Sequence, residues 1–164
     1  MTDLQDFLIY RSNPDITEYQ GFDVMTYEQA ENFIRENTHK NLGIPGEWIQ
    51  YGIVKKETGK IIGDCAVRFT GMNHRTGEIG ITISHLEQRK GYAIETIIAL
   101  VDHFFKALQL YSVVVKTDVE NTGANELLKK TGFRQKRQLV ENVFFKGKQG
   151  SEYHYTLLNT EWNK

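Results

Sequence analysis

The sequence predicts an α+β domain in which helices flank one mixed β-sheet. Apolar residues alternate over short stretches in the middle of the chain, and they recur at steps of three and four after Gly91. Strand and helix patterns then alternate before a final pair of strands, as expected for a mixed sheet. The 164 residues have the length of one domain and contain no linker-like stretch, so we expect a single domain over residues 1–164.

The first third of the chain reads as helices and loops. Apolar residues between Leu4 and Tyr10 predict a short helix that ends near Asn13 and Pro14. A longer helix is expected after Thr26, and a loop over residues 41–47 ends this section.

Strands are expected at residues 48–55, 61–69 and 78–83. In the third strand isoleucine alternates with polar or small residues from Glu78 to Ile83, so one face is buried and the other is free for polar work. The strongest helix pattern runs from Ile94 to Leu108. A strand at 112–116, a helix at 124–130 and an antiparallel pair at 139–145 and 153–158, around a turn at 147–150, complete the prediction.

Charge and composition exclude several classes of partner. The net charge of -1, from 20 basic and 21 acidic residues, provides no overall attraction to nucleic acid or to an anionic membrane surface. No apolar run approaches the ~18 residues of a membrane span, and the first residues do not resemble a signal peptide. We therefore expect a cytoplasmic protein without nucleic-acid or membrane partners.

The single cysteine and the five histidines indicate no special chemistry. Cys65 lies in a predicted strand and is interpreted as a small buried hydrophobe of a reducing compartment, rather than as an acyl-carrying thiol. The histidines show no metal-ligand spacing, so no metal site is expected. His85 is interpreted as a surface loop residue and His154 as part of the sheet, and the two tryptophans as core or edge anchors.

The most informative segment is the loop Ser84–Gly91, between a predicted strand and the long helix. The start of a helix carries unpaired amide groups and a partial positive charge, which together bind anions. Gly91 allows a phosphate to approach the backbone, and Arg89 and Lys90 add positive charge. The loop lacks the Gly-Lys-Ser/Thr of a P-loop and the three-glycine dinucleotide motif, so it predicts a different phosphate ligand.

The hexapeptide Gln88–Ala93 (Gln-Arg-Lys-Gly-Tyr-Ala) resembles the Gln/Arg-x-x-Gly-x-Gly/Ala signature of the GNAT superfamily of N-acetyltransferases. Asn121 followed by Leu127–Arg134 is similar to the second conserved block of that family. Asn142–Gly147, Glu152–Leu158 and Glu161–Trp162 look like its Rim-type (RimJ/RimL-like) branch, whose members are relatives of the ribosomal-protein N-terminal acetyltransferases. The resemblance covers roughly residues 4–162.

The resemblance implies a fold in which two strands of the sheet splay apart, with acetyl-coenzyme A as the cofactor. The pyrophosphate would lie on the loop amides, and the pantetheine arm would run beside the strand that ends at Ile83. Glu78 matches a family carboxylate that acts as a base through a water molecule; the alternative is a glutamate that merely starts a strand in solvent. The cofactor-binding residues implied are Ile81, Ile83, Gln88, Arg89, Lys90, Gly91, Tyr92, Ala93 and Asn121.

The chain departs from its relatives at the group that protonates the leaving thiolate. Ala124 and Leu128 stand where family members carry a serine or a tyrosine. A water molecule or Ser84 would have to substitute, or the thiolate leaves unaided, because a free thiol has a pKa of only ~8.5. The opening strand of the Rim-type relatives also has no counterpart before Leu4.

These patterns predict an N-acetyltransferase that moves the acetyl group to a primary amine, either a protein N-terminus or a small molecule, by direct attack. A catalytically weak or inactive acyl-coenzyme A sensor is the alternative, motivated by Ala124 and Leu128. An unrelated α+β interaction domain is a third reading, which needs the Gly91 loop to be structural only. We expect a monomer or a weak homodimer.

Overall fold

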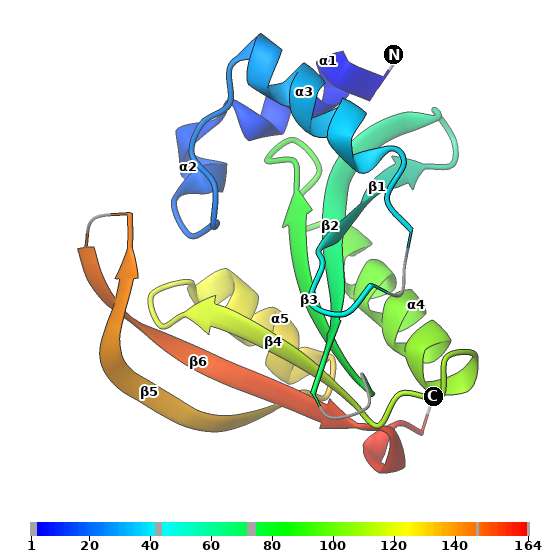
Figure 1. Cartoon of the computed structure of the whole chain (residues 1–164), viewed down its shortest axis with the longest axis vertical. Helices are drawn as coiled ribbons and strands as arrows, with labels where there is room; N and C mark the ends of the chain where they lie inside the picture. Colours follow the sequence, from blue (N-terminus) through cyan, green and yellow to red (C-terminus); the bar gives the residue numbers. More distant parts are fainter. Residues whose placement is uncertain (1–2, 42–43, 72–74, 147, 164) are drawn as a thin grey trace.

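The chain forms one six-stranded mixed sheet with helices on both faces (Figure 1), which confirms the predicted fold class. A computed structural model describes residues 3–41, 44–71, 75–146 and 148–163, with only the backbone at 137–145 and 148. The elements are α1 (Asp3–Arg11), α2 (Pro14–Thr17), α3 (Tyr27–Asn37), β1 (Ile49–Lys55), β2 (Lys60–Thr70), β3 (Thr76–Ile83), α4 (Tyr92–Lys106), β4 (Ser112–Asp118), α5 (Thr122–Lys130), β5 (Arg134–Phe145), β6 (Lys148–Leu158) and the short 3-10 turn η2 (Asn159–Glu161).

The sheet consists of two antiparallel arms joined by a short parallel contact. The strand order is β1-β2-β3-β4-β6-β5. Only three residue pairs join β3 to β4, and the last of them is Glu78 with Val114. Beyond this pair the two strands run apart, and Figure 1 shows the arms opening toward α2 and the β5–β6 turn. The splayed strand pair of the prediction is therefore present.

The two faces of the sheet have different roles, because side chains alternate along each strand. Val67 and Ile79 point to the face covered by α4, where they join the main apolar core with Val101 and Phe104. The opposite face carries α1 and, farther along β3, Glu78. The apolar core thus lies behind the sheet, and the polar side chains of the splayed strands lie in front of it.

A buried ion pair anchors the N-terminal helices to the sheet. The Arg11 guanidinium is 2% exposed and donates from Nη2 to Asp64 Oδ1 at 2.7 Å and from Nε to Oδ2 at 3.0 Å. The Tyr10 hydroxyl donates to the same Oδ2 at 2.8 Å. The Phe22 ring lies 3.6 Å from the guanidinium carbon and covers the pair. All three polar groups are therefore satisfied where water is excluded.

Several helix boundaries follow local capping chemistry. The first helix ends at Arg11, close to the predicted stop near Asn13 and Pro14, and Asn13 accepts from the Asp15 amide to start α2, with Pro14 as its first residue. Proline suits this position because its missing N–H has no helical partner there. Thr26 and Gln29 form a capping box that starts α3, which confirms the predicted start.

The C-terminal hairpin differs most from the prediction. β5 begins at Arg134 and β6 at Lys148, so both strands are longer than predicted and Gly150 lies inside β6 rather than in the turn. The polar run at the start of β5 lacks strand alternation, and its pairing with β6 is interrupted by two register shifts. Among the described residues the first element is α1, and β1 lies at the sheet edge.

Within the described ranges, no helix combines the length and the hydrophobicity that a transmembrane span requires.

Replacing Arg11 by methionine should destabilise the protein by about 3–5 kcal/mol, because the Asp64 carboxylate is left buried without its cation. Urea denaturation followed by circular dichroism measures the change. Arg134→Met is the matched control: this side chain is 76% exposed and pairs with Glu161 at 3.0 Å, so the loss should stay below ~1 kcal/mol. Equal losses in the two variants would contradict the assignment of Arg11 as the anchor.

Candidate active site

The loop between β3 and α4 presents a run of free amides. Gly91 is the N-cap of α4 with a φ of +92°, and no side chain caps the helix. The Glu95 amide is the first of α4 to donate to a backbone carbonyl, that of Gly91. Among the described residues, the amides from Gln88 to Ile94 donate to no backbone carbonyl. Arg89 also has a positive φ, of 60°. Such left-handed turns direct successive amides into a shallow nest that binds anions.

The side chains around this loop leave one cation available. Lys90 donates to the Leu86 carbonyl at 2.8 Å and to Glu87 at 3.0 Å, and Lys55 of β1 lies 3.5 Å from the same carboxylate. The hydrogen bond from Lys90, followed by the charge of Lys55, lowers the pKa of Glu87. Arg89 is exposed, and within the described part of the chain it makes no ion pair. Its guanidinium is therefore the free positive charge beside the amides.

Gly91 also fits the close approach of a phosphate. No atom lies within 4 Å of the position that a Cβ would take, so the space in front of the amides is open. Tyr92 and Ala93 follow as the first residues of α4, and the Tyr92 ring lies 5.6 Å from the Lys55 ammonium. The residues present thus suit a diphosphate such as that of coenzyme A, and Lys55 is a neighbour that sequence reasoning missed.

The outer part of β3 offers backbone groups to the gap between the arms. The Ser84 amide donates to Ile62 of β2 at 2.8 Å, and the β2–β3 register is unbroken. In an antiparallel pair, successive residues direct their backbone N–H and C=O groups alternately toward the partner strand and away from it. Because Ser84 is directed toward β2, the backbone groups of Ile81 and Ile83 are directed toward the gap. The side chain of Gln88 already donates to the Ile83 carbonyl at 3.2 Å. Gln88 therefore shapes the loop, whereas the Ile81 groups stay open.

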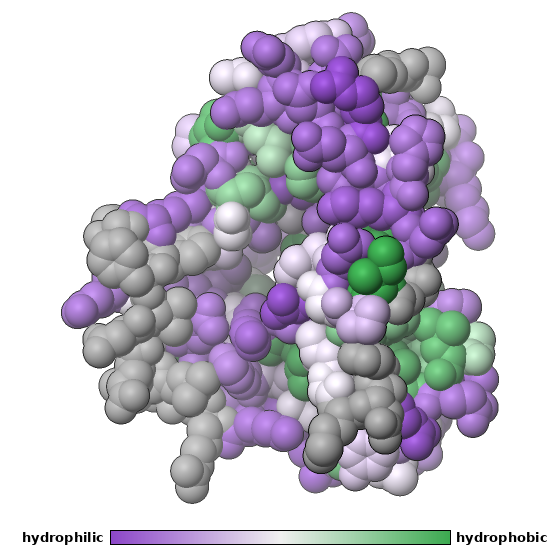
Figure 2. All heavy atoms as spheres, viewed as in Figure 1, coloured by the Kyte–Doolittle hydropathy of each residue, from purple (hydrophilic) through white to green (hydrophobic). Residues whose placement is uncertain are grey.

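A cleft of about 250 Å³ lies between the arms, on the face that carries α1. Figure 2 shows the surface hollowed between the N-terminal helices and the strands below them, with mostly hydrophilic atoms around the hollow. Trp48, which directly precedes the edge strand β1, is half-buried and lines this cleft. The lining residues are Tyr19, Gln20, Gly21, Trp48, Glu78, Ile79, Gly80, Lys116, Thr117, Asp118, Gly150, Ser151 and Glu152.

Glu78 is held at one end of the cleft by two cations. Its Oε2 accepts from Arg68 Nε at 2.8 Å and lies 2.7 Å from Nη2, and its Oε1 lies 3.4 Å from Lys116 Nζ. The Arg68 guanidinium lies over the Trp48 ring at 4.5 Å. With 7% of its surface exposed, Glu78 is not the solvent-facing start of a strand, and that alternative is wrong.

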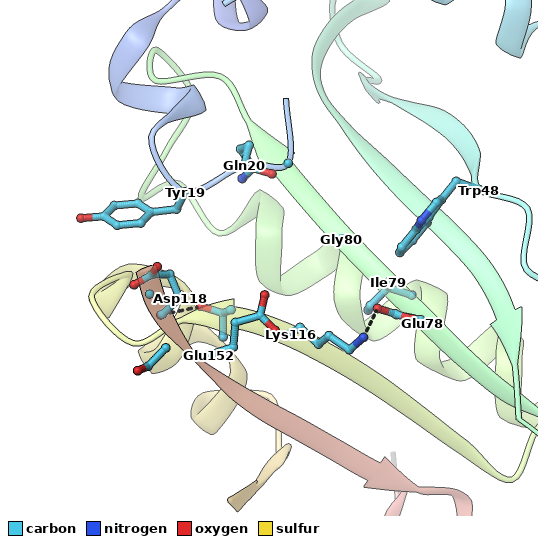
Figure 3. A pocket seen from close by; sticks show the side chains of 13 residues that line it. Tyr19, Gln20, Trp48, Glu78, Ile79, Gly80, Lys116, Asp118 and Glu152 are labelled. Atoms are coloured by element: carbon cyan, nitrogen blue, oxygen red, sulfur yellow. Dashed lines mark hydrogen bonds and ion pairs between the residues drawn. The ribbon is translucent and has the colours of Figure 1, made fainter. Parts of the chain in front are cut away.

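The other end of the cleft is acidic. Asp118 of β4 and Glu152 of β6 are directly opposite each other in the sheet, and Figure 3 shows both away from Trp48 and Glu78. Partial desolvation and nearby carboxylates, including Asp118, raise the pKa of Tyr19. Like charges on opposite strands repel each other. This end of the cleft therefore favours a positively charged ligand.

The positions where the family carries a donor for the leaving thiolate offer none in this chain. Leu128 is 3% exposed and belongs to the apolar core, and Ala124 carries no polar group. Ser84, the substitute considered from the sequence, is buried and does not line the cleft. Asn121 accepts from the Ala124 amide at 3.1 Å, which confirms the capping interpretation and leaves its side-chain N–H groups available.

The remaining residues have structural places. His85 is exposed in its loop, and Trp162 donates to Asp102 at 3.1 Å and lies against Phe105 of α4, as an anchor would. His154 lies 3.3 Å from Glu152. In the ranges that the structure describes, no three His, Cys, Asp or Glu side chains are grouped to hold a metal ion.

Sequence reasoning missed most of the cleft. Arg68, Lys116, Asp118 and Glu152 line or support it, and each lies on a strand whose neighbouring residues are apolar or small. The available signal was charge at alternate positions of β4, where Lys116 and Asp118 follow the apolar Val113–Val115. A strand buried on both faces would not carry them.

The splayed mixed sheet and the loop of free amides at the start of α4 are the arrangement that the family resemblance implied, and comparison with known proteins shows the family. The chain belongs to the GNAT acetyltransferase family, because the model described as "Acetyltransferase (GNAT) domain" matches residues 1–134. Enzymes of this family use acetyl-coenzyme A, and the chain is accordingly a GNAT-family N-acetyltransferase.

Relatives and solved structures agree with this family. An uncharacterized N-acetyltransferase, p20, from Bacillus licheniformis is 29% identical over 93% of this chain and 85% of its own length. A GNAT acetyltransferase structure from Bacillus anthracis matches 98% of this chain and 91% of its own with a TM-score of 0.87 and 22% identity. The spermidine N-acetyltransferase of Vibrio cholerae, solved with coenzyme A and spermine, matches 98% and 92% with a TM-score of 0.79 and 23% identity.

Cys65 should be inert toward thiol reagents in the folded protein. Burial, followed by the charge of Asp64, raises the pKa of its thiol to about 12. Because the thiolate is the reactive form, the native rate should be roughly a thousandfold below that of a free thiol, and urea should restore it. Absorbance with an aromatic disulfide measures the rate, and a Lys129→Cys/Cys65→Ala variant is the exposed control. Rapid native labelling would contradict the structural role.

Proposed function

We propose that this chain transfers the acetyl group of acetyl-coenzyme A to a primary amine by direct attack in the cleft between β3 and β4. The observation that carries the proposal is the position of Glu78, which lines the cleft where the strands part, on the strand that leads into the free amides of the Gly91 loop. One strand thus links an anion site to a polar reaction site. We place the enzyme in the cytoplasm, as a single domain that is a monomer or a weak dimer.

In this proposal the amides from Arg89 to Ala93 and the Arg89 guanidinium bind the pyrophosphate of the cofactor, and Gln88 holds the loop by its bond to Ile83. The open backbone groups of Ile81 and the amide N–H of Ile83 bond to the pantetheine arm, which the side chain of Asn121 also contacts. Once bound, the cofactor supplies a thioester whose acetyl carbon is open to attack by an amine.

The residues of the cleft can manage the charge that develops during transfer. A main-chain N–H near Ile81 faces the gap and can donate to the carbonyl oxygen as it becomes negative. Glu78 can take the proton of the amine through a water molecule, because it lines the cleft and its Oε1 lies 3.4 Å from Lys116 Nζ, another lining residue. The amine nitrogen forms the new N–C bond while the C–S bond breaks. The electron pair of the C–S bond leaves with sulfur, which takes a proton from water.

The acidic end of the cleft supports an acceptor with a second positive charge. Asp118 and Glu152 can attract a distant ammonium while a second nitrogen reaches toward Glu78. A spermidine N(1)-acetyltransferase of Vibrio cholerae is 35% identical over 75 residues, which cover 46% of this chain and 43% of its own length. We therefore favour a small polyamine-like acceptor over a protein N-terminus, within the Rim-type branch that the C-terminal strands resemble.

The alternative is an acyl-coenzyme A sensor with weak or no catalysis, favoured by the absence of a donor at Ala124 and Leu128. A panel of spermine, 1,4-diaminobutane, n-butylamine and an unblocked peptide, read by thiol release, separates the two. Turnover with any of these amines supports the enzyme. Tight coenzyme A binding in calorimetry without turnover on the panel supports the sensor.

Gly91→Glu should abolish coenzyme A binding, because a carboxylate would occupy the amides meant for phosphate and repel its charge. We expect the affinity measured by calorimetry to fall at least a hundredfold. Gly132→Glu is the matched control, since Gly132 also has a positive φ, of 96°, with nothing within 4 Å of its Cβ position. It carries the same backbone strain but should bind coenzyme A normally. Equal losses in both variants would show that strain, not the loop, is responsible.

Glu78→Gln should lower kcat by about 10²–10³ and leave coenzyme A affinity within twofold, as expected when a general base is removed. Thiol release measures the rate and calorimetry the affinity. A thermal melt checks that Arg68, which loses its carboxylate partner, still leaves the protein folded. Unchanged kcat in a folded variant would remove Glu78 from the mechanism.

A further inference from the structure

Lys116 carries a positive charge at the point where the two arms of the sheet separate. It lies on β4 two residues beyond Val114, which forms the last parallel pair with Glu78. Its Nζ lies 3.4 Å from Glu78 Oε1, its side chain is 41% exposed, and it lines the cleft (Figure 3). An amine that reaches Glu78 therefore comes within a few ångströms of the Lys116 side-chain nitrogen.

The fold alone gives little reason for this charge. Oε2 of Glu78 already interacts with both Nε and Nη2 of Arg68, so the carboxylate has a cation partner without Lys116. A partly exposed pair such as Lys116–Glu78 adds about 0–1 kcal/mol to stability. A lysine in this position also repels cations from the end of a cleft whose other end attracts them.

Resting on the proposed function, we infer that Lys116 is a positioning residue that keeps the attacking amine neutral. A free alkylamine has a pKa of about 10.4, so almost all of it is protonated near neutral pH and cannot attack. A like charge within ~4–6 Å disfavours the protonated form and lowers that pKa. The ammonium of Lys116 thus promotes loss of the amine proton, to water or through water to Glu78, before the N–C bond forms.

The same charge orients an acceptor that has two nitrogens. Lys116 repels the nitrogen next to Glu78 when that nitrogen is a cation but not when it is a neutral amine. The distant nitrogen stays an ammonium and is attracted by the acidic end of the cleft. Lys116 and His154 are directly opposite in the β4–β6 pairing, as are Asp118 and Glu152. The charged and titratable groups around Lys116 are Glu78 of β3 with its partner Arg68 of β2, His154 opposite it on β6, and the other ionisable groups of the cleft, Asp118 of β4, Glu152 of β6 and Tyr19 of the segment after α2.

The test is the pH dependence of kcat in Lys116→Gln, measured with whichever amine of the panel the wild type acetylates fastest. At saturation kcat reports ionisation in the complex, so its acidic limb should move up by about one pH unit. Near pH 7 kcat should fall about tenfold, and above the shifted limb it should return to within twofold of the wild type. The KM should fall at the same time, because the protonated acceptor is no longer repelled.

Three controls isolate the charge of Lys116. Lys116→Arg keeps the charge and should keep the wild-type profile. Lys129→Gln removes a lysine from the Lys129–Glu126 pair on α5, outside the cleft, and should change nothing. Because an imidazole can titrate in the same pH range, the comparison is repeated with His154→Gln, where the Lys116-dependent shift should persist.

The possible failures are distinct. If Lys116 has a purely structural role, Lys116→Gln will lower kcat at every pH and raise KM. If the acidic limb of the kcat profile moves by less than 0.3 unit, about a twofold effect, Lys116 does not act on the amine. Either result overturns the inference while the proposed function stands. A wild-type chain that binds coenzyme A and acetylates no amine of the panel overturns the proposed function, and this inference with it.

Discussion

The site depends on the separation of β3 from β4 after only three parallel pairs. Backbone N–H and C=O groups near a protein interior need hydrogen-bond partners, and beyond Glu78 those of Ile79 and Ile81 have lost the neighbouring strand. The gap therefore presents strand-like donors and acceptors to an extended ligand. The apolar core behind the sheet, where α4 packs against Val67 and Ile79, holds the arms in this arrangement.

Two anchors bring the remaining walls of the cleft to this gap. The Arg11–Asp64 pair fixes α1 on β2, which places the segment containing Tyr19 over the front of the sheet. From the other side, Lys146 at the β5–β6 turn donates to the Thr17 carbonyl at 2.6 Å. The helical section and the C-terminal hairpin are thus joined across the cleft, although they lie at opposite ends of the sequence.

Most elements of the fold were predictable because their patterns are local. The alternation in β3, the periodicity of α4 and the capping residues Thr26 and Asn121 each act within a few residues. The strand β5 was only half predicted, since its polar start has no alternation and it is paired by β6 through an irregular register. The pattern around Trp48 did not decide its place, because an aromatic residue beside a strand has the same pattern whether it enters a core or a cleft.

The sequence by itself determined the family, the mixed sheet and the Gly91 loop, because a glycine before a helix and the amides that follow it act within one short segment. It did not determine the charge distribution of the cleft. Glu78 forms ion pairs with Arg68 of β2 and Lys116 of β4, and Asp118 of β4 lies opposite Glu152 of β6. Only the tertiary structure decides such pairs, because electrostatic interactions depend on distance in space and on burial, which separation along the chain does not specify.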